Sequence, residues 1–128
     1  MPRLSAKDLL HEALALDAAG KEKLAIPLYR RAITAKLPRP DLHTALIGLG
    51  SSLHTVGQPQ SAIRTLRKAR TLFPHDPAIL LFLALAHAAA GQHKLALRQL
   101  ADAYLKESTH SSLPLYRKTL LRKYHAVR

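Results

Sequence analysis

The chain has 128 residues, of which 48% are apolar and 22% charged, a composition typical of globular rather than disordered proteins. This length corresponds to one domain, which can bury a sizeable core without metal ions or disulfides. The lack of cysteine excludes disulfide frameworks, thiol catalysis and cysteine-ligated zinc, and it fits a reducing compartment. The 20 lysines and arginines against 8 acidic residues give a net charge of +12.

The composition favours helices over strands, because alanine and leucine are abundant while aromatic residues make up only 5%. The first apolar stretch, in "MPRLSAKDLLHEALALDAAGKEKL", is interrupted by charged residues and does not look like a secretory signal peptide. The uncharged stretch "AILLFLALAHAAAG" is shorter than the ~20 residues that a membrane-spanning helix needs. We therefore predict an all-α protein, without a membrane span, in the cytoplasm.

One sequence unit occurs three times along the chain. Gly57 and Gly91 are 34 residues apart, and the alanines that follow each of them keep the same spacing. A shift of 37 residues from Gly57 brings the same pattern onto Gly20, with three extra residues in the linker "LPRPDL". The predicted units are, in chain order, residues 6–39, 43–76 and 77–110.

Each unit predicts a helical hairpin. In the second unit, Gly57 and Pro59 separate two apolar-periodic stretches, "LHTALIGLGSSLHTV" and "QSAIRTLRKARTLF". The glycine is expected to end the first helix in a left-handed conformation, which is energetically unfavourable for residues with a Cβ atom. Two antiparallel helices approach closely only through small side chains, so we expect Gly50 to lie opposite Ala62.

With these positions, the chain resembles the tetratricopeptide repeat, whose 34-residue unit places large and small residues at set positions. The second unit matches at Leu46, Leu49, Gly50, Leu53, Ala62, Leu66, Ala69 and Pro74. The third matches at Leu80, Leu83, Ala84, His87, Ala96, Leu100 and Ala103, with Ser108 in place of the closing proline. The first matches at Leu9, Ala13, Leu16, Gly20, Ala25, Tyr29 and Ala32, with Glu12 where leucine is usual and Pro38 one place late.

Three sequence segments are also similar to those of a bacterial subgroup, the group-five tetratricopeptide repeats: "AIPLYRRAI", "ALIGLGSSL" and "LFLALAHAAAGQHKLAL". The resemblance implies a single domain over residues 1–128, a right-handed superhelix of three hairpins plus a carboxyl-terminal capping helix. Residues 112–126 are predicted to form that cap, because they carry an apolar stripe at helical spacing. The stripe consists of Leu113, Tyr116, Leu120 and Tyr124, and it continues to Val127 directly after this range.

By the family's geometry, the first helices of successive units line a concave groove, and the groove positions of residues 78–89 are all apolar. The sequence is compatible with three occupants of this groove: the chain's own terminal helix, a second copy of the protein, or a helix or peptide of a protein partner. The candidate partner-binding residues are Leu14, Ile47, Ser51, Leu81, Phe82 and Leu85. Family members that grip a chaperone's terminal carboxylate use lysine, arginine and asparagine along the groove, and such a clamp is absent from Leu10, Leu14, Ile47, Ser51, Leu81 and Leu85.

The second helices carry a basic stripe at outward positions, where it forms either a solvated face or a binding face for nucleic acid or an acidic protein. The stripe consists of Arg30, Arg31, Arg64, Arg67, Lys68 and Arg98. Without a stacking platform, a nucleic-acid contact would be mostly to phosphate. The six aromatic residues are expected mainly at inward positions: Tyr29, Phe73, Phe82, Tyr104, Tyr116 and Tyr124.

No catalytic, metal or cofactor site is predicted. The eight histidines show no HExxH motif and no pair four residues apart on one helix, and His87 is expected in the core with a polar edge. Ser51, His54 and Asp17 could form a Ser-His-Asp grouping, but no nucleophile elbow or oxyanion hole accompanies them. The sequence therefore favours a non-enzymatic adaptor, with phosphate-dominated nucleic-acid binding as the alternative.

Overall fold

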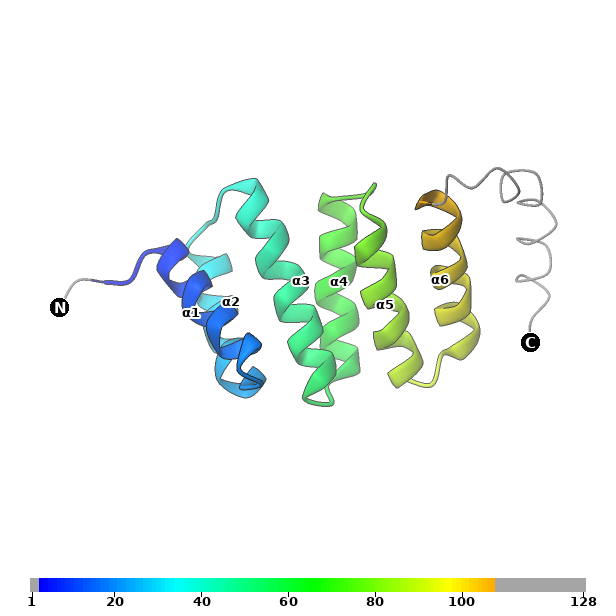
Figure 1. Cartoon of the computed structure of the whole chain (residues 1–128), viewed down its shortest axis with the longest axis horizontal. Coiled ribbons are helices and arrows are strands. Elements are labelled where there is room, and N and C mark those ends of the chain that lie inside the picture. Colours follow the sequence, from blue (N-terminus) through cyan, green and yellow to red (C-terminus); the bar gives the residue numbers. More distant parts are fainter. Residues whose placement is uncertain (1–2, 108–128) are drawn as a thin grey trace.

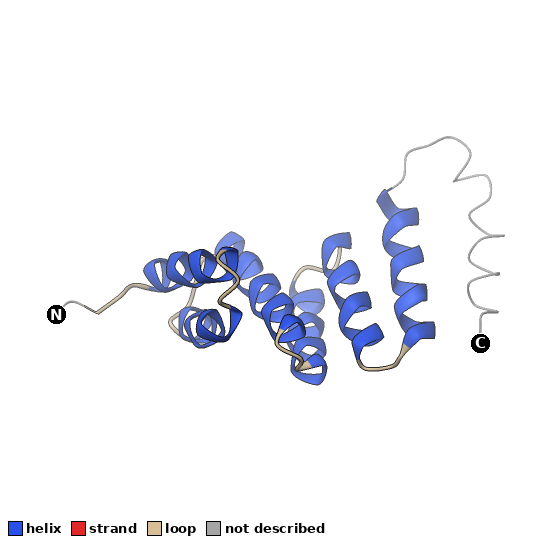
Figure 2. Ribbon diagram, turned by 60° about the horizontal axis from the view of Figure 1, so that its bottom comes forward, coloured by secondary structure: helices blue, strands red, loops and turns tan. Residues whose placement is uncertain are grey.

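The computed structural model describes residues 3–107, which form an elongated array of helices that follow one another along its long axis (Figure 1). The helices are α1 (Ala6–Ala18), α2 (Glu22–Thr34), α3 (Arg39–Thr55), α4 (Pro59–Leu72), α5 (Pro77–Ala89) and α6 (His93–Glu107). The described part contains helices and loops and no strand (Figure 2). The predicted all-α array of helical hairpins is confirmed.

The helices pack as three hairpins, α1 with α2, α3 with α4, and α5 with α6. Successive hairpins meet where α2 contacts α3 and α4 contacts α5. The first helices also contact one another, α1 with α3 and α3 with α5, whereas within residues 3–107 no contact joins α2 to α4 or α4 to α6. The first helices therefore form the inner layer of the array and the second helices its outer layer.

The three hairpin turns share one geometry. Gly20, Gly57 and Gly91 follow the first helices with φ of +75°, +83° and +82°, the left-handed conformation expected for them. In the second hairpin, the Gly57 amide donates to the His54 carbonyl at 3.1 Å, and the Gln58 amide donates to the Leu53 carbonyl at 2.9 Å. The same pair of bonds recurs at the other two turns, so each glycine closes its helix by the Schellman arrangement.

Glycine also permits close packing within helices. A Cβ atom added to Gly50 would lie 2.5 Å from the Leu66 Cγ, so a side chain at position 50 would strike Leu66. Leu66 follows Ala62, the residue that we expected opposite Gly50, by one turn of α4. The glycine therefore makes room for a large side chain of α4. At Gly48, an added Cβ would lie 2.5 Å from the Tyr29 ring, so this glycine admits α3 against α2 of the preceding hairpin.

Helix α3 begins earlier than the sequence units predict. The second unit was expected to begin at residue 43, but α3 starts at Arg39 and takes up most of the linker as an extra turn. Pro40 is tolerated in a first turn because the amide that it lacks has no partner within the helix. The negative charge of Asp41 in the same turn stabilises the helix, because it lies near the positive end of the helix dipole.

Helix α5, which contains the uncharged stretch, is buried on one face. This is the face that the repeat pattern predicted to pack against α6, the second helix of the same hairpin. Leu80, Leu83, Ala84 and His87 are all buried, and the His87 Nδ1 lies 2.8 Å from the Gln99 Oε1 of α6. No helix within residues 3–107 is both long and apolar enough to cross a membrane. The apolar character of α5 thus serves the packing of the array on this face.

Lys36, just after α2, has the only positive φ of a residue other than glycine within the described chain, at 66°. A left-handed conformation costs an L-residue about 1–2 kcal/mol, which exceeds the entropy that glycine loses on folding. We expect Lys36→Gly to raise the free energy of unfolding by about 0.5–1 kcal/mol in urea titrations followed by circular dichroism. Lys36→Ala, which keeps the Cβ atom, is the control and should leave stability unchanged; a gain as large as that of glycine would contradict the explanation.

Candidate functional site

A pocket of about 330 Å³ opens on the inner layer of helices, and we call it the inner pocket. It brings together side chains from three hairpins. Its lining consists of Leu14, Asp17, Tyr29, His43, Thr44, Ile47, Gly48, Ser51 and Phe82. Four of the six residues that we singled out for partner binding thus lie around one pocket: Leu14, Ile47, Ser51 and Phe82. The other two, Leu81 and Leu85, lie outside it on α5, with exposed fractions of 42% and 51%.

The floor of the inner pocket contains a polar network that the sequence patterns did not suggest. The Tyr29 hydroxyl of α2 donates a hydrogen bond to Asp17 Oδ2 of α1 at 2.7 Å. The Ser52 hydroxyl of α3 donates to the same oxygen at 3.3 Å. Tyr29 and Ser52 are buried and Asp17 is partly buried, so three helices hold this carboxylate in place.

The Tyr29 hydroxyl is fixed as the donor in this network. Burial, followed by the hydrogen bond and charge of Asp17, raises the pKa of Tyr29 well above its ordinary value of 10.0. The phenol therefore stays protonated across the physiological range and continues to donate to the carboxylate. Asp17 is correspondingly an acceptor on its Oδ2 side.

A second cluster fixes the rim of the inner pocket where α3 meets the loop before α5. His43 pairs with Asp76 through its Nε2 and meets the Phe73 ring edge-on, with 4.8 Å between the ring centroids. The Arg39 guanidinium lies 4.5 Å from the centroid of the same ring and donates to the Leu72 carbonyl. Asp76 also caps α5 by accepting from the Ala78 amide at 2.9 Å. His43 thus joins the second hairpin to the start of α5, whereas the contacts of Arg39 stay within the second hairpin.

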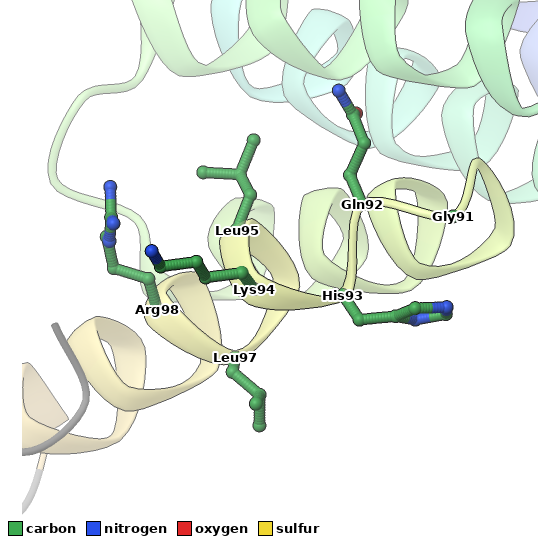
Figure 3. A pocket seen from close by; sticks show the side chains of 7 residues that line it. All are labelled: Gly91, Gln92, His93, Lys94, Leu95, Leu97 and Arg98. Atoms are coloured by element: carbon green, nitrogen blue, oxygen red, sulfur yellow. The ribbon is translucent and has the colours of Figure 1, made fainter. Parts of the chain in front are cut away.

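A larger pocket, of about 670 Å³, lies at the turn before α6 and is lined by residues 91–95, 97 and 98 (Figure 3). Leu95 and Leu97 leave α6 on opposite sides, while Lys94 and Arg98 point the same way (Figure 3). A single segment lines this pocket, so no second element of the described chain completes a site here.

The pocket next to Leu97 lies at the open end of the described array. The residues equivalent to Leu97 and Leu100 are buried in the first two hairpins, where α3 and α5 pack on them: Ile26, Tyr29, Ile63 and Leu66. Leu97 and Leu100 themselves are 39% and 43% exposed, although the repeat pattern places Leu100 inward. Tyr104, also expected to face inward, is 63% exposed. The predicted capping helix, residues 112–126, lies outside the described residues.

The predicted basic residues lie on the second helices, in the outer layer. Arg30, Arg31, Arg64, Arg67 and Lys68 are exposed. Arg30 and Arg31 line a shallow pocket of about 440 Å³ together with Arg3. Arg98 differs from the others because it is half-buried and its Nε atom has no hydrogen-bond partner within the described chain.

The grouping of Ser51, His54 and Asp17 is not joined by hydrogen bonds in the described structure. Asp17 accepts from Tyr29 and Ser52 instead, and the His54 Nδ1 is buried without a partner there. Within residues 3–107, no three histidine, aspartate or glutamate side chains are placed to hold a metal ion. The arrangement offers a concave apolar surface with one fixed carboxylate.

Stacked hairpins with an inner layer of first helices define the class of helical-repeat proteins. The family model described as "Tetratrico peptide repeat" matches residues 7–126, nearly the whole sequence. The chain belongs to the tetratricopeptide repeat family. No curated protein matches it. Repeats of this family generally mediate protein–protein interactions, and the family is typically non-enzymatic. The closer likeness to the bacterial group-five repeats stays a prediction.

Proposed function

We propose that the protein is a non-enzymatic binding module or assembly adaptor that holds a partner against its inner layer of helices. The partner is an amphipathic helix or an extended peptide of another protein, or a second copy of this chain. The observation that carries the proposal is the exposure of Leu81 and Leu85 on the same helix as Phe82, which lines the inner pocket. Large exposed apolar side chains beside a concave apolar surface are typical of binding sites. A composition without cysteine is compatible with action in the cytoplasm.

The proposal predicts that Leu81→Asp combined with Leu85→Asp abolishes binding of a partner, or dimer formation, and leaves the helical circular dichroism unchanged. Two carboxylates in the apolar contact would have to lose their hydration without a partner, which costs several kcal/mol. Light scattering gives the mass in solution, and fluorescence anisotropy gives the affinity for a labelled peptide selected on the wild-type protein from a random library. Lys68→Asp with Arg70→Asp on the outer layer is the matched control and should leave this binding intact. Unfolding of the Leu81 and Leu85 variant would place both leucines in the core and contradict the proposal.

The basic residues support a second candidate function, binding of nucleic acid or of an acidic protein through the outer layer. Helix α4 exposes Arg64, Arg67, Lys68 and Arg70 and contains no acidic residue. The long-range field of these residues would also attract an acidic partner. Because they lie in the outer layer, they favour contact with phosphates or carboxylates there rather than in the inner pocket.

Salt separates the two candidates. If duplex DNA contacts about six basic residues, a plot of the logarithm of its affinity against the logarithm of salt concentration should have a slope of about −5. Binding to the inner layer, driven by burial of apolar surface, should weaken little over the same range. Fluorescence anisotropy with labelled DNA and RNA duplexes at several salt concentrations makes the measurement. No binding of either probe at low salt would eliminate the nucleic-acid candidate.

A further inference from the structure

The carboxylate at the floor of the inner pocket has an oxygen without a donor. Asp17 Oδ2 accepts both the Tyr29 and the Ser52 hydroxyl, whereas no residue among those described donates to Asp17 Oδ1. No lysine, arginine or histidine within residues 3–107 forms an ion pair with Asp17. A carboxylate has about four acceptor sites, so Asp17 retains the capacity for a charged donor.

No lysine or arginine of the described chain lines the inner pocket. Lys7 and Arg39 are the only lysine and arginine on α1, α3 and α5. The Lys7 Nζ lies 3.9 Å from the Asp41 Oδ2, and the Arg39 guanidinium contacts the Phe73 ring and donates to the Leu72 carbonyl. His43, the one lining residue of the inner pocket with a cationic form, pairs with Asp76. The outward lysines and arginines lie on the second helices, on the far side of each hairpin. The inner pocket therefore contains one carboxylate that forms no ion pair within residues 3–107.

The remaining lining suits the stem of a long side chain. Leu14 of α1, Ile47 of α3 and Phe82 of α5 supply apolar surface from three hairpins around Asp17. Lysine and arginine bury their methylene stems along such surface while the charged head seeks a polar partner. Arginine binds best when both oxygens of a carboxylate are free, whereas an ammonium group acts as a single point charge. Because the Oδ2 atom is already saturated by two hydroxyls, the free Oδ1 favours an ammonium head.

We propose that the inner pocket takes a lysine side chain of the partner, with its stem against Leu14, Ile47 and Phe82 and its ammonium group on Asp17 Oδ1. This inference rests on the proposed function and names the chemistry of its partner. The net charge of +12 repels a strongly basic segment, so the segment bears one lysine among apolar residues rather than a basic cluster.

A display library of random 12-residue peptides tests the proposal on the full chain. Selection on the wild-type protein should enrich peptides with one lysine beside apolar residues. Selection on Asp17→Asn, which keeps an acceptor oxygen for Tyr29 and Ser52 but removes the charge, should lose that lysine preference. Glu12→Gln is the matched control: it makes the same chemical change on α1 at an exposed position outside the pocket, and it should select the same peptides as the wild type.

The affinity of one selected peptide gives the size of the effect. Replacing its lysine with norleucine, which keeps the stem and removes the ammonium group, should weaken binding to the wild type by roughly ten- to a hundredfold. The same replacement should change binding to Asp17→Asn by less than about threefold. Because the peptide is changed rather than the protein, the wild-type measurement does not depend on how well Asp17→Asn folds.

The possible outcomes separate this inference from the proposed function. Selected peptides that lose affinity with Leu81→Asp and Leu85→Asp but contain no preferred lysine, or that tolerate norleucine, would overturn the lysine pocket and leave the adaptor intact. If the wild type selects no peptide but is a dimer in light scattering, the lysine pocket is overturned and the adaptor stands. If it selects no peptide and is also a monomer, or if selected peptides ignore the leucine substitutions, the adaptor function itself fails.

Discussion

Gly50→Ala is expected to lower the free energy of unfolding by about 1–3 kcal/mol, the range typical of an overpacked core. Alanine is the better helix former by about 1 kcal/mol, so helix propensity alone predicts the opposite sign. The added methyl group would lie 2.5 Å from the Leu66 Cγ and 2.6 Å from its Cδ2. Leu66 is fully buried, so its side chain cannot move aside into solvent. Urea titrations followed by circular dichroism measure the change.

Leu66→Ala provides the control for this close approach. Alone, it should destabilise the protein by about 2–5 kcal/mol, because it leaves a cavity against α3. Combined with Gly50→Ala, it removes the atoms that the new methyl group would strike, and the double variant should be more stable than the sum of the single changes implies. A coupling energy of about 0.5–3 kcal/mol would identify the contact. Additive losses, or a gain in stability from Gly50→Ala alone, would contradict it.

The repeat period predicted the hairpins because it reports packing that is local in sequence. Each turn needs a left-handed residue at a fixed position, and Gly20, Gly57 and Gly91 therefore keep their spacing. The buried faces follow from the helical period, as the burial of Leu80, Leu83 and His87 confirms. The start of α3 was not predicted, because a linker with two prolines indicates a loop unless the prolines fall in a first helical turn.

The inner pocket could be predicted only in part. Leu14, Ile47, Ser51 and Phe82 line one pocket because the family's geometry assigns first-helix positions to one side of the array, and their role in partner binding stays a prediction. Asp17 and Tyr29 were not connected, since a carboxylate and a phenol in different helices give no periodic signal. The two residues are 12 apart and lie on either side of Gly20, so folding the sequence about this glycine could have paired them.

The third hairpin contains a similar polar pair, also 12 residues apart across its glycine. His87 and Gln99 are both buried, and the His87 Nδ1 lies 2.8 Å from the Gln99 Oε1. An amide oxygen only accepts hydrogen bonds, so the imidazole donates through Nδ1 and leaves Nε2 as an acceptor. Nε2 is buried and has no partner within the described residues. The pair therefore combines one good hydrogen bond with one unsatisfied atom.

The equivalent positions of the first hairpin are apolar, Leu16 and Leu28, and both pack against the core. His87→Leu alone should lower the free energy of unfolding by about 1–3 kcal/mol, because the Gln99 amide would stay buried without its donor. Gln99→Leu alone should have an effect of similar size, since it leaves both imidazole nitrogens unpaired. The double variant copies the first hairpin and also removes the unsatisfied Nε2, so its stability should equal or exceed that of the wild type. Urea titrations of the four proteins give the coupling energy between the two sites. If the double variant were as unstable as the two losses added together, the third hairpin would not accept the packing of the first, and the equivalence of the repeats would not extend to their interiors.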